Sequence, residues 1–245
     1  MEMARRTDDR RVVLLLATFP QATPKQVRAE LTGRTAPIRA RMTGDALQLV
    51  TATRLVDDPL GAAGQASGRD IRPLGALIEI TGSPDTPEED LLRPLKGFGN
   101  WFGGVFDTVQ SAVAVGAVRR ITRGPEGPVI LTLATRKLPR LDNPQFHEYW
   151  AGTHAPLALS LMPPGAAERI AYQQLHADED ASSRAAEITG VGIGDYAGIL
   201  QVRSAKTGDF LDVAAEPSFA KKIYDDELNF VEQRGMFGSF LTSDS

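Results

Sequence analysis

The strongest constraint on the fold is that the second half of this chain repeats the pattern of the first. The apolar run at residues 13–18 matches residues 130–135 in residue type, and Thr-Gly-Arg-Thr-Ala-Pro at 32–37 matches Ala-Gly-Thr-His-Ala-Pro at 151–156. The offset stays at roughly 120 residues, about half of the 245-residue chain. A repeat of this length predicts two copies of one structural unit.

Apolar periodicity and breaker residues predict the same order of elements in both halves. For the first half we expect strands at 11–18, 46–55 and 74–81, a helix at 24–38 capped by Thr23, and another helix from 86. Residues 57–72, rich in glycine, alanine and serine, are expected to be a mobile loop, and an apolar run at 105–118 leads to a joint at 119–128. In the second half the corresponding segments are strands at 168–176 and 195–203, a helix at 210–219 and a closing strand at 236–242. The acidic residues 178–180 are expected to form a solvated loop.

The order β-α-β-β-α in each half is typical of the ferredoxin-like split βαβ unit. Helices cover one face of such a sheet, and the other face must be buried against a second sheet. We therefore expect an α+β fold in which two tandem ferredoxin-like repeats pack sheet to sheet within one chain. Residues 1–122 would form the N-terminal repeat and residues 128–245 the C-terminal repeat.

Composition removes several classes of function. The chain has no cysteine, which excludes disulfides, thiolate metal sites and cysteine nucleophiles and favours a cytoplasmic location. The apolar run at 12–17 is too short for a signal peptide, and no apolar stretch reaches the length of a membrane span. A net charge of −4 with dispersed basic residues gives no footprint for nucleic acid. We expect small molecules or proteins as partners, with no nucleic acid and no membrane, and a homodimer stays open.

Residues 143–161 are the part of the chain most clearly marked for function. Asp142 or Asn143 can cap a helix that has Pro144 in its first turn. An arc of about 100° on this helix holds the residues that should face the core: Phe146, His147, Trp150, His154, Leu157 and Leu161. Gly152 and Pro156 weaken a straight helix, so a bend is expected beside a buried His154.

The same residues carry a family resemblance. Phe-His-Glu-Tyr-Trp at 146–150 and Thr-His-Ala-Pro-Leu at 153–157, followed by Arg-Ile-Ala-Tyr at 169–172 and Asp-Asp-Glu at 225–227, resemble the EthD family over about residues 128–242. The resemblance implies the dimeric α+β barrel fold, with pockets between each sheet and its helices. It also implies small apolar or aromatic metabolites, and relatives that include cofactor-free monooxygenases, cyclases, decarboxylases and dehydratases. The fold alone does not choose among these activities.

Chemistry is expected only in the second half, because Thr35 stands where His154 stands in the repeat. A histidine suits proton transfer near neutral pH, so His154 is the candidate acid or base, with Tyr149 or Tyr172 to bind a polar oxygen. The expected wall of the substrate site is Trp150, Phe146 and Leu161, although Phe146 also suits a purely core position. A structural alternative is that His154 bonds a backbone carbonyl that Pro156 leaves free.

Histidine spacing argues against a metal site. His147 and His154 are two helical turns apart, about 10 Å along the axis, and cannot chelate one ion. His176 ends a predicted strand, where it either pairs with His154 beside the substrate or lies at the surface. No metal and no cofactor are expected, although a haem ligand at His154 or His176 stays open.

The favoured function is a cofactor-independent enzyme that uses His154 for elimination, decarboxylation, isomerisation or cyclisation of a small apolar or aromatic metabolite, as a lyase or isomerase. A cofactor-free oxygenase of a phenol and a non-catalytic binding protein of a degradation pathway are the alternatives. Residues 97–104, with Phe98, Trp101 and Phe102 among glycines, either cover a pocket or form a broken helix packed on the barrel.

Overall fold

A closed barrel of antiparallel strands organises the molecule. The computed structural model describes residues 8–43, 46–66, 68–101, 104–192, 194–214 and 216–243. In these residues eight strands follow the order β2-β4-β1-β5-β7-β8-β6-β9, and β9 pairs back to β2 through Arg54 and Leu241. The strands are β1 (Asp9–Thr18), β2 (Gln48–Arg54), β4 (Ala76–Gly82), β5 (Phe106–Arg120), β6 (Val129–Lys137), β7 (Ile170–Ala177), β8 (Gly198–Ser204) and β9 (Val231–Ser243).

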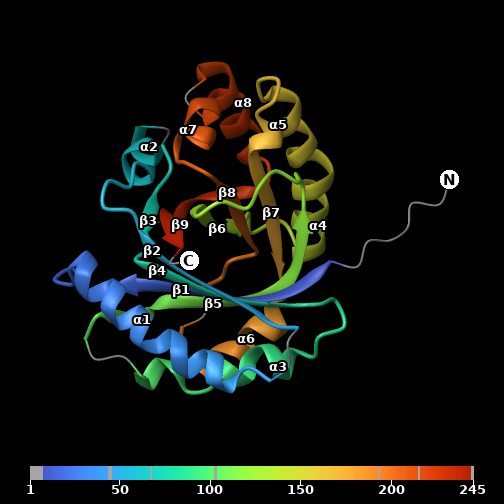
Figure 1. The fold of residues 1–245 in the computed structure, drawn as a ribbon. Coiled ribbons are helices and arrows are strands. Elements are labelled where there is room, and N and C mark those ends of the chain that lie inside the picture. The colour runs from blue at the N-terminus through green and yellow to red at the C-terminus, as the bar shows by residue number, and fades with distance from the viewer. Residues whose placement is uncertain are drawn as a thin grey trace.

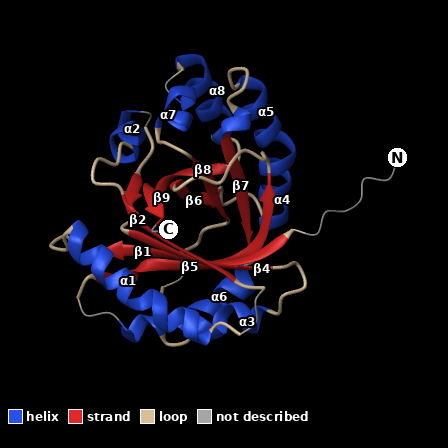
Figure 2. Ribbon diagram, in the orientation of Figure 1, coloured by secondary structure: helices blue, strands red, loops and turns tan. Residues whose placement is uncertain are grey.

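The helices form one layer outside each half of the barrel (Figures 1 and 2). One layer holds α1 (Pro24–Arg41), α3 (Glu88–Leu92) and α6 (Glu179–Thr189), outside β4, β1 and β5. The other layer holds α2 (Leu60–Ala66), α4 (Asn143–Tyr149), α5 (Ala155–Leu161), α7 (Gly208–Ala214) and α8 (Pro217–Glu227). None of the helices in the described ranges is both long and apolar enough to cross a membrane.

The alternation of side chains along β1 explains why this strand is buried on both faces. Val13, Leu15 and Ala17 point into the barrel, whereas Leu14 and Leu16 face the layer of α1 and α6. A strand with this burial needs a nearly continuous apolar run, which is what residues 12–17 provide. The prediction of a buried strand at 11–18 is confirmed, as is the Thr23 cap at the start of α1, where Gln26 completes a capping box.

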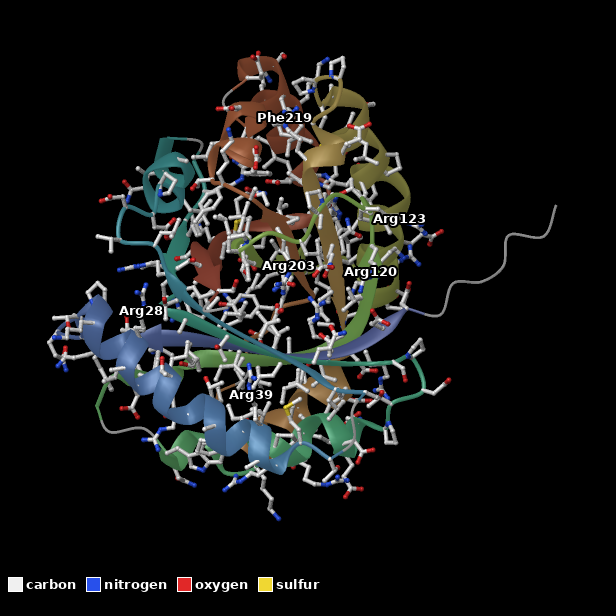
Figure 3. All side chains as sticks on the ribbon, in the orientation of Figure 1. Arg28, Arg39, Arg120, Arg123, Arg203 and Phe219 are labelled. Carbon is white, nitrogen blue, oxygen red and sulfur yellow. The ribbon has the colours of Figure 1, made fainter. Side chains whose placement is uncertain are left out.

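A charged cluster lies inside the barrel, between the two halves. Arg11 donates to Gln201 at 2.5 Å and to Gln173 at 3.0 Å, and Glu79 pairs with both Arg11 and Arg203. The labelled Arg203 lies in the middle of the molecule in Figure 3. Burial lowers the pKa of Arg11, and the two arginines hold the pKa of Glu79 below its usual value although burial alone would raise it. Glu79 is therefore a charged group that links the two halves across the barrel.

Besides the helix expected at 210–219, which is divided into α7 and α8, two segments differ from the sequence-based expectation. Residues 57–72, expected to be a mobile loop, contain helix α2 and strand β3 (Ile71–Pro73), which pairs in parallel with residues 236–238 of β9. Residues 178–180, expected to be a solvated loop, start helix α6, whose first turn is capped by Asp178 through the Ala181 amide at 2.9 Å. Both predictions were wrong because tertiary pairing and a local cap outweighed polar composition.

The aromatic residues of 97–104 belong to the layer of α1 and α6. Phe98 is fully buried in that core, its ring centroid is 5.3 Å from that of Trp101, and Arg41 lies over the Trp101 ring. Phe102 and Gly103 lie outside the described residues. For Phe98 and Trp101, packing on the barrel is therefore the role that the structure supports.

Candidate active site

The helix that carries His154 is widened just before that residue. Asp142 caps α4 through the Gln145 amide at 2.8 Å, with Pro144 in the first turn. Residues Trp150–His154 form a π-helical turn, in which the Ala155 amide bonds to the carbonyl of Trp150. The proline at 156 offers no amide to Gly152, which accounts for the irregular turn. Such turns are common at functional sites, and here the expected bend takes this form.

His154 is held by a carboxylate from the other end of the second half. Its Nδ1 atom lies 2.7 Å from Oδ2 of Asp226, on α8, and Tyr149 donates its hydroxyl to Oδ1 of Asp226 at 2.8 Å. The ring packs against Phe230 with centroids 5.0 Å apart. The expected alternative, a bond from His154 to a free backbone carbonyl, is therefore not what the structure shows. With Nδ1 engaged by a carboxylate, Nε2 is the nitrogen left to meet a ligand.

His154 lies in the wall of an apolar cavity of about 220 Å³ between β6, β7 and β8 and the helices outside them. Other helical wall residues come from α5, α7 and α8, and Leu60, Ala63, Gly64, Arg69 and Ile71 come from the N-terminal half. The remaining wall residues on the strands are Leu131, Leu133, Tyr172, Leu200, Val202 and Phe240. The labelled Phe219 marks the helical side of this cavity in Figure 3.

Tyr172 brings a hydroxyl to the same cavity from strand β7. Its side chain is buried, and Gln174 donates to its oxygen at 2.8 Å. Burial raises the pKa of Tyr172, although donors on Gln174 and Trp150 act in the opposite sense. Tyr172 therefore stays a neutral phenol, which can donate a hydrogen bond but does not serve as a base near neutral pH.

The structure places the other predicted site residues outside the cavity wall. Phe146 is fully buried in a core with Trp150 and Phe230, and Leu161 packs against a neighbouring cluster of α5, α7 and α8. Trp150 lies flat on β8, where a Cβ at Gly198 would come within 2.3 Å of its ring. Tyr149 bonds Asp226, and burial followed by that carboxylate raises the pKa of Tyr149. Of the predicted residues, His154 and Tyr172 are the two that share the cavity.

His147 and His176 form a stacked pair beside Trp150, not a pair with His154. Their ring centroids are 4.5 Å apart, and the His176 ring also stacks on Trp150 at 5.5 Å. His147 donates to the Ala197 carbonyl at 2.8 Å. Burial, reinforced by His147, lowers the pKa of His176 to about 3, and burial also lowers the pKa of His147.

The low pKa of His176 in this pair predicts that the folded protein loses stability in acid. An ordinary histidine takes up a proton near pH 6.5. Below that pH the unfolded chain therefore binds a proton at His176, whereas the folded protein does not bind it until about pH 3. The contribution of neutral His176 to the free energy of unfolding is complete above pH 6.5 and is lost as the pH drops toward 3. Between pH 7.5 and 4.5, His176→Gln should remove about 2–3 kcal/mol of the loss in the free energy of unfolding. Urea unfolding of both proteins at the two pH values measures this, and parallel losses would contradict the account.

The site does not fit a haem or a metal ion. An apolar cavity of about 150 Å³ holds one benzene ring, so one of about 220 Å³ is too small for a macrocycle of four rings bound at His154. The His176 ring is covered by His147 and Trp150, and its Nε2 lies 3.2 Å from Oε1 of Gln174. Within the described ranges, no group of three His, Asp or Glu side chains could hold a metal ion.

Sequence reasoning missed Asp226 and the contribution of the N-terminal half. Asp226 belongs to the Asp-Asp-Glu motif at 225–227, but it is 72 positions from His154 in the sequence. Residue spacing alone does not predict a contact over that separation. Arg69 pairs with Glu227 at 2.8 Å, and its guanidinium lies over the Tyr224 ring. The segment mistaken for a loop thus completes the cavity wall.

These features define the class of the protein: an α+β barrel with an apolar cavity between one sheet and its helices. Solved structures of chlorite dismutases share this fold. One is a presumed chlorite dismutase, 10% identical, with a TM-score of 0.54 and 97% of this chain and 95% of that chain covered. Another is chlorite dismutase from Candidatus Nitrospira defluvii in complex with imidazole, 7% identical, with a TM-score of 0.51 and 97% and 91% covered.

A comparison of the sequence with family models finds a similarity in the half that contains His154. Residues 138–234 match the model of the EthD domain family. No curated protein sequence matches the chain. The match includes His154, Tyr172 and Asp226, but Leu60, Arg69 and Ile71 lie outside it.

Proposed function

We propose that this protein is a cofactor-independent enzyme that uses His154 as general acid and base on a small apolar or aromatic metabolite. The observation that carries the proposal is the geometry of His154, with Nδ1 on the Asp226 carboxylate and the ring in the wall of an apolar cavity. A histidine oriented in this way suits a general base, because the carboxylate fixes the tautomer and stabilises the imidazolium that forms.

The proposed chemistry is a proton transfer between substrate and Nε2 of His154. Nε2 removes a proton from a C–H or O–H group, and the bonding electrons move onto an adjacent oxygen, which Tyr172 stabilises with a hydrogen bond. The same proton is then returned elsewhere on the substrate or used to release a leaving group. Elimination, decarboxylation, isomerisation and cyclisation all fit this sequence, and Tyr149 serves to position Asp226.

The volume and lining of the cavity support a substrate class. A cavity of about 220 Å³ exceeds the roughly 150 Å³ that takes benzene but lies below the roughly 300–1,000 Å³ typical of drug-sized ligands. The wall is mostly aliphatic and aromatic, and His154 and Tyr172 offer polar atoms to a ligand. We infer a substrate of about one substituted ring that carries a carbonyl or hydroxyl group.

We also propose that the two halves are ferredoxin-like repeats, residues 1–122 and 128–245, and that the first has lost the site. The orders β2-β4-β1-β5 and β7-β8-β6-β9 support this, because the third strand of each set lies between its first two. Thr35, at the position of His154, bonds the Leu31 carbonyl, and Leu31, Ile38 and Phe98 fill the space under that helix.

The test is a mass-spectrometric survey of turnover on phenols, aryl ketones, hydroxy-ketones and aryl carboxylates, run in air and under argon. The proposal predicts turnover that persists under argon, with a mass change that names the reaction. Turnover that stops under argon would replace it with a cofactor-free oxygenase. Retention of these ligands without turnover would replace it with a binding protein.

A further inference from the structure

Three polar side chains at alternate positions of β7, Tyr172, Gln174 and His176, lie on the face of the strand that the helices cover. They form a chain of hydrogen bonds that ends at the cavity. The Nε2 atom of His176 lies 3.2 Å from Oε1 of Gln174. The Nε2 atom of Gln174 lies 2.8 Å from the hydroxyl oxygen of Tyr172. The Gln174 side chain is fully buried. Residues two apart on a strand share a face, so the alternation itself places the three side chains in a row.

The direction of this chain is fixed by a backbone carbonyl. Nε2 of Gln174 also lies 3.3 Å from the Trp150 carbonyl, which can only accept a hydrogen bond. The amide must therefore present its NH2 group to Trp150 and Tyr172, and its oxygen to His176. It follows that His176 is the neutral tautomer with its proton on Nε2.

The surroundings of His176 keep that tautomer in place. The ring is held between His147 and Trp150, and its low pKa, caused by burial and the neighbouring His147, keeps it uncharged near neutral pH. Because Gln174 donates to the Tyr172 oxygen, the proton of that hydroxyl must point elsewhere. Among the described residues no side chain or carbonyl accepts it, and Tyr172 lies in the cavity wall.

We propose that Gln174, held by His176, is a positioning residue that turns the Tyr172 hydroxyl proton into the cavity. The site would then select ligands that offer a hydrogen bond acceptor, such as a ketone oxygen, to Tyr172 while an acidic C–H or O–H group faces His154. This inference rests on the proposed function and deepens it, because it names enolisable carbonyl compounds and phenols as the substrate class.

The test uses the carbonyl stretch of ¹³C-labelled acetophenone bound to the whole protein, recorded by infrared difference spectroscopy. The wild type should show a band lowered in frequency relative to Tyr172→Phe. Gln174→Met should return the band toward the Tyr172→Phe position and raise Kd about fivefold, as expected for one hydrogen bond. An unshifted, wild-type band in Gln174→Met would overturn the proposal.

Gln173→Met is the matched control, because Gln173 is buried on the same strand but faces Arg11 inside the barrel. It should leave the band of bound acetophenone unchanged, and a shift equal to that of Gln174→Met would overturn the assignment to Gln174. A second readout needs no ligand: ¹⁵N spectra of His176 should show the neutral Nε2–H tautomer from pH 6 to 8. The Nδ1–H tautomer would overturn the positioning chain, whereas failure of acetophenone to bind would count against the proposed substrate class alone.

Discussion

Replacing His154 by glutamine is expected to lower kcat/KM by about 10²–10⁴, the range that a general base contributes, with little change in substrate Kd. Glutamine keeps a polar group near Asp226 but cannot take a proton from the substrate. Asp226→Asn should lower kcat/KM by up to about 10⁴-fold, because the carboxylate no longer fixes the His154 tautomer. Steady-state kinetics on the substrate found by the survey measure both effects.

Asp225→Asn is the matched control for Asp226→Asn. Asp225 is the adjacent residue on α8, but its exposed side chain pairs with Lys221. It should keep wild-type kcat/KM. Equal activity of His154→Gln and wild type would show that His154 is not the acid or base, even if the cavity binds the substrate.

Glu79→Gln is expected to lower the free energy of unfolding by about 3–5 kcal/mol, because it leaves Arg11 and Arg203 inside the barrel without their shared counter-charge. The side chain of Glu79 is only 1% exposed, so solvent cannot compensate. Urea unfolding at neutral pH measures the loss. A variant too unstable to isolate would agree with the expectation.

The control is Glu88→Gln, which breaks ion pairs with Arg184 at 2.8 Å and with Arg10 at 3.6 Å near the surface. The Arg184 side chain is 55% exposed, so water replaces most of this pair and the loss of stability should be much smaller than that of Glu79→Gln. Similar small losses for Glu79→Gln and Glu88→Gln would show that the cluster inside the barrel does not link the two halves.

The elements with strong local signals could be predicted from the sequence. Strand β1, the Thr23 cap of α1, a cap of α4 at residue 142 or 143 and the buried position of His154 follow from apolar runs, caps and helical periodicity, and the structure confirms them. Helix α6 could not be placed, because its eleven residues include only a narrow apolar face of alanines, among them Ala181 and Ala185. Such a face gives little periodic signal until a partner surface is known.

Within the site, the sequence identified residues but not their partners. His154 and Tyr172 lie on different elements and share the cavity as expected, whereas Trp150 belongs to the packing of β8. Helical periodicity states which side of a helix is buried, but it does not separate a core contact from a cavity wall. Asp226, Leu60 and Arg69 reach His154 or its cavity only through tertiary packing, which no spacing rule reports.

The central claim is that the cavity holds a ligand with an oxygen on Tyr172 and an acidic C–H or O–H group facing His154. A crystal structure of the protein soaked with 4-hydroxyacetophenone tests it most directly. The account predicts one ring in the cavity, with a ligand oxygen at hydrogen-bond distance, about 2.6–3.2 Å, from Tyr172 Oη and an acidic group at a similar distance from His154 Nε2. A ligand bound elsewhere, with His154 still on Asp226 and the cavity empty, would contradict it.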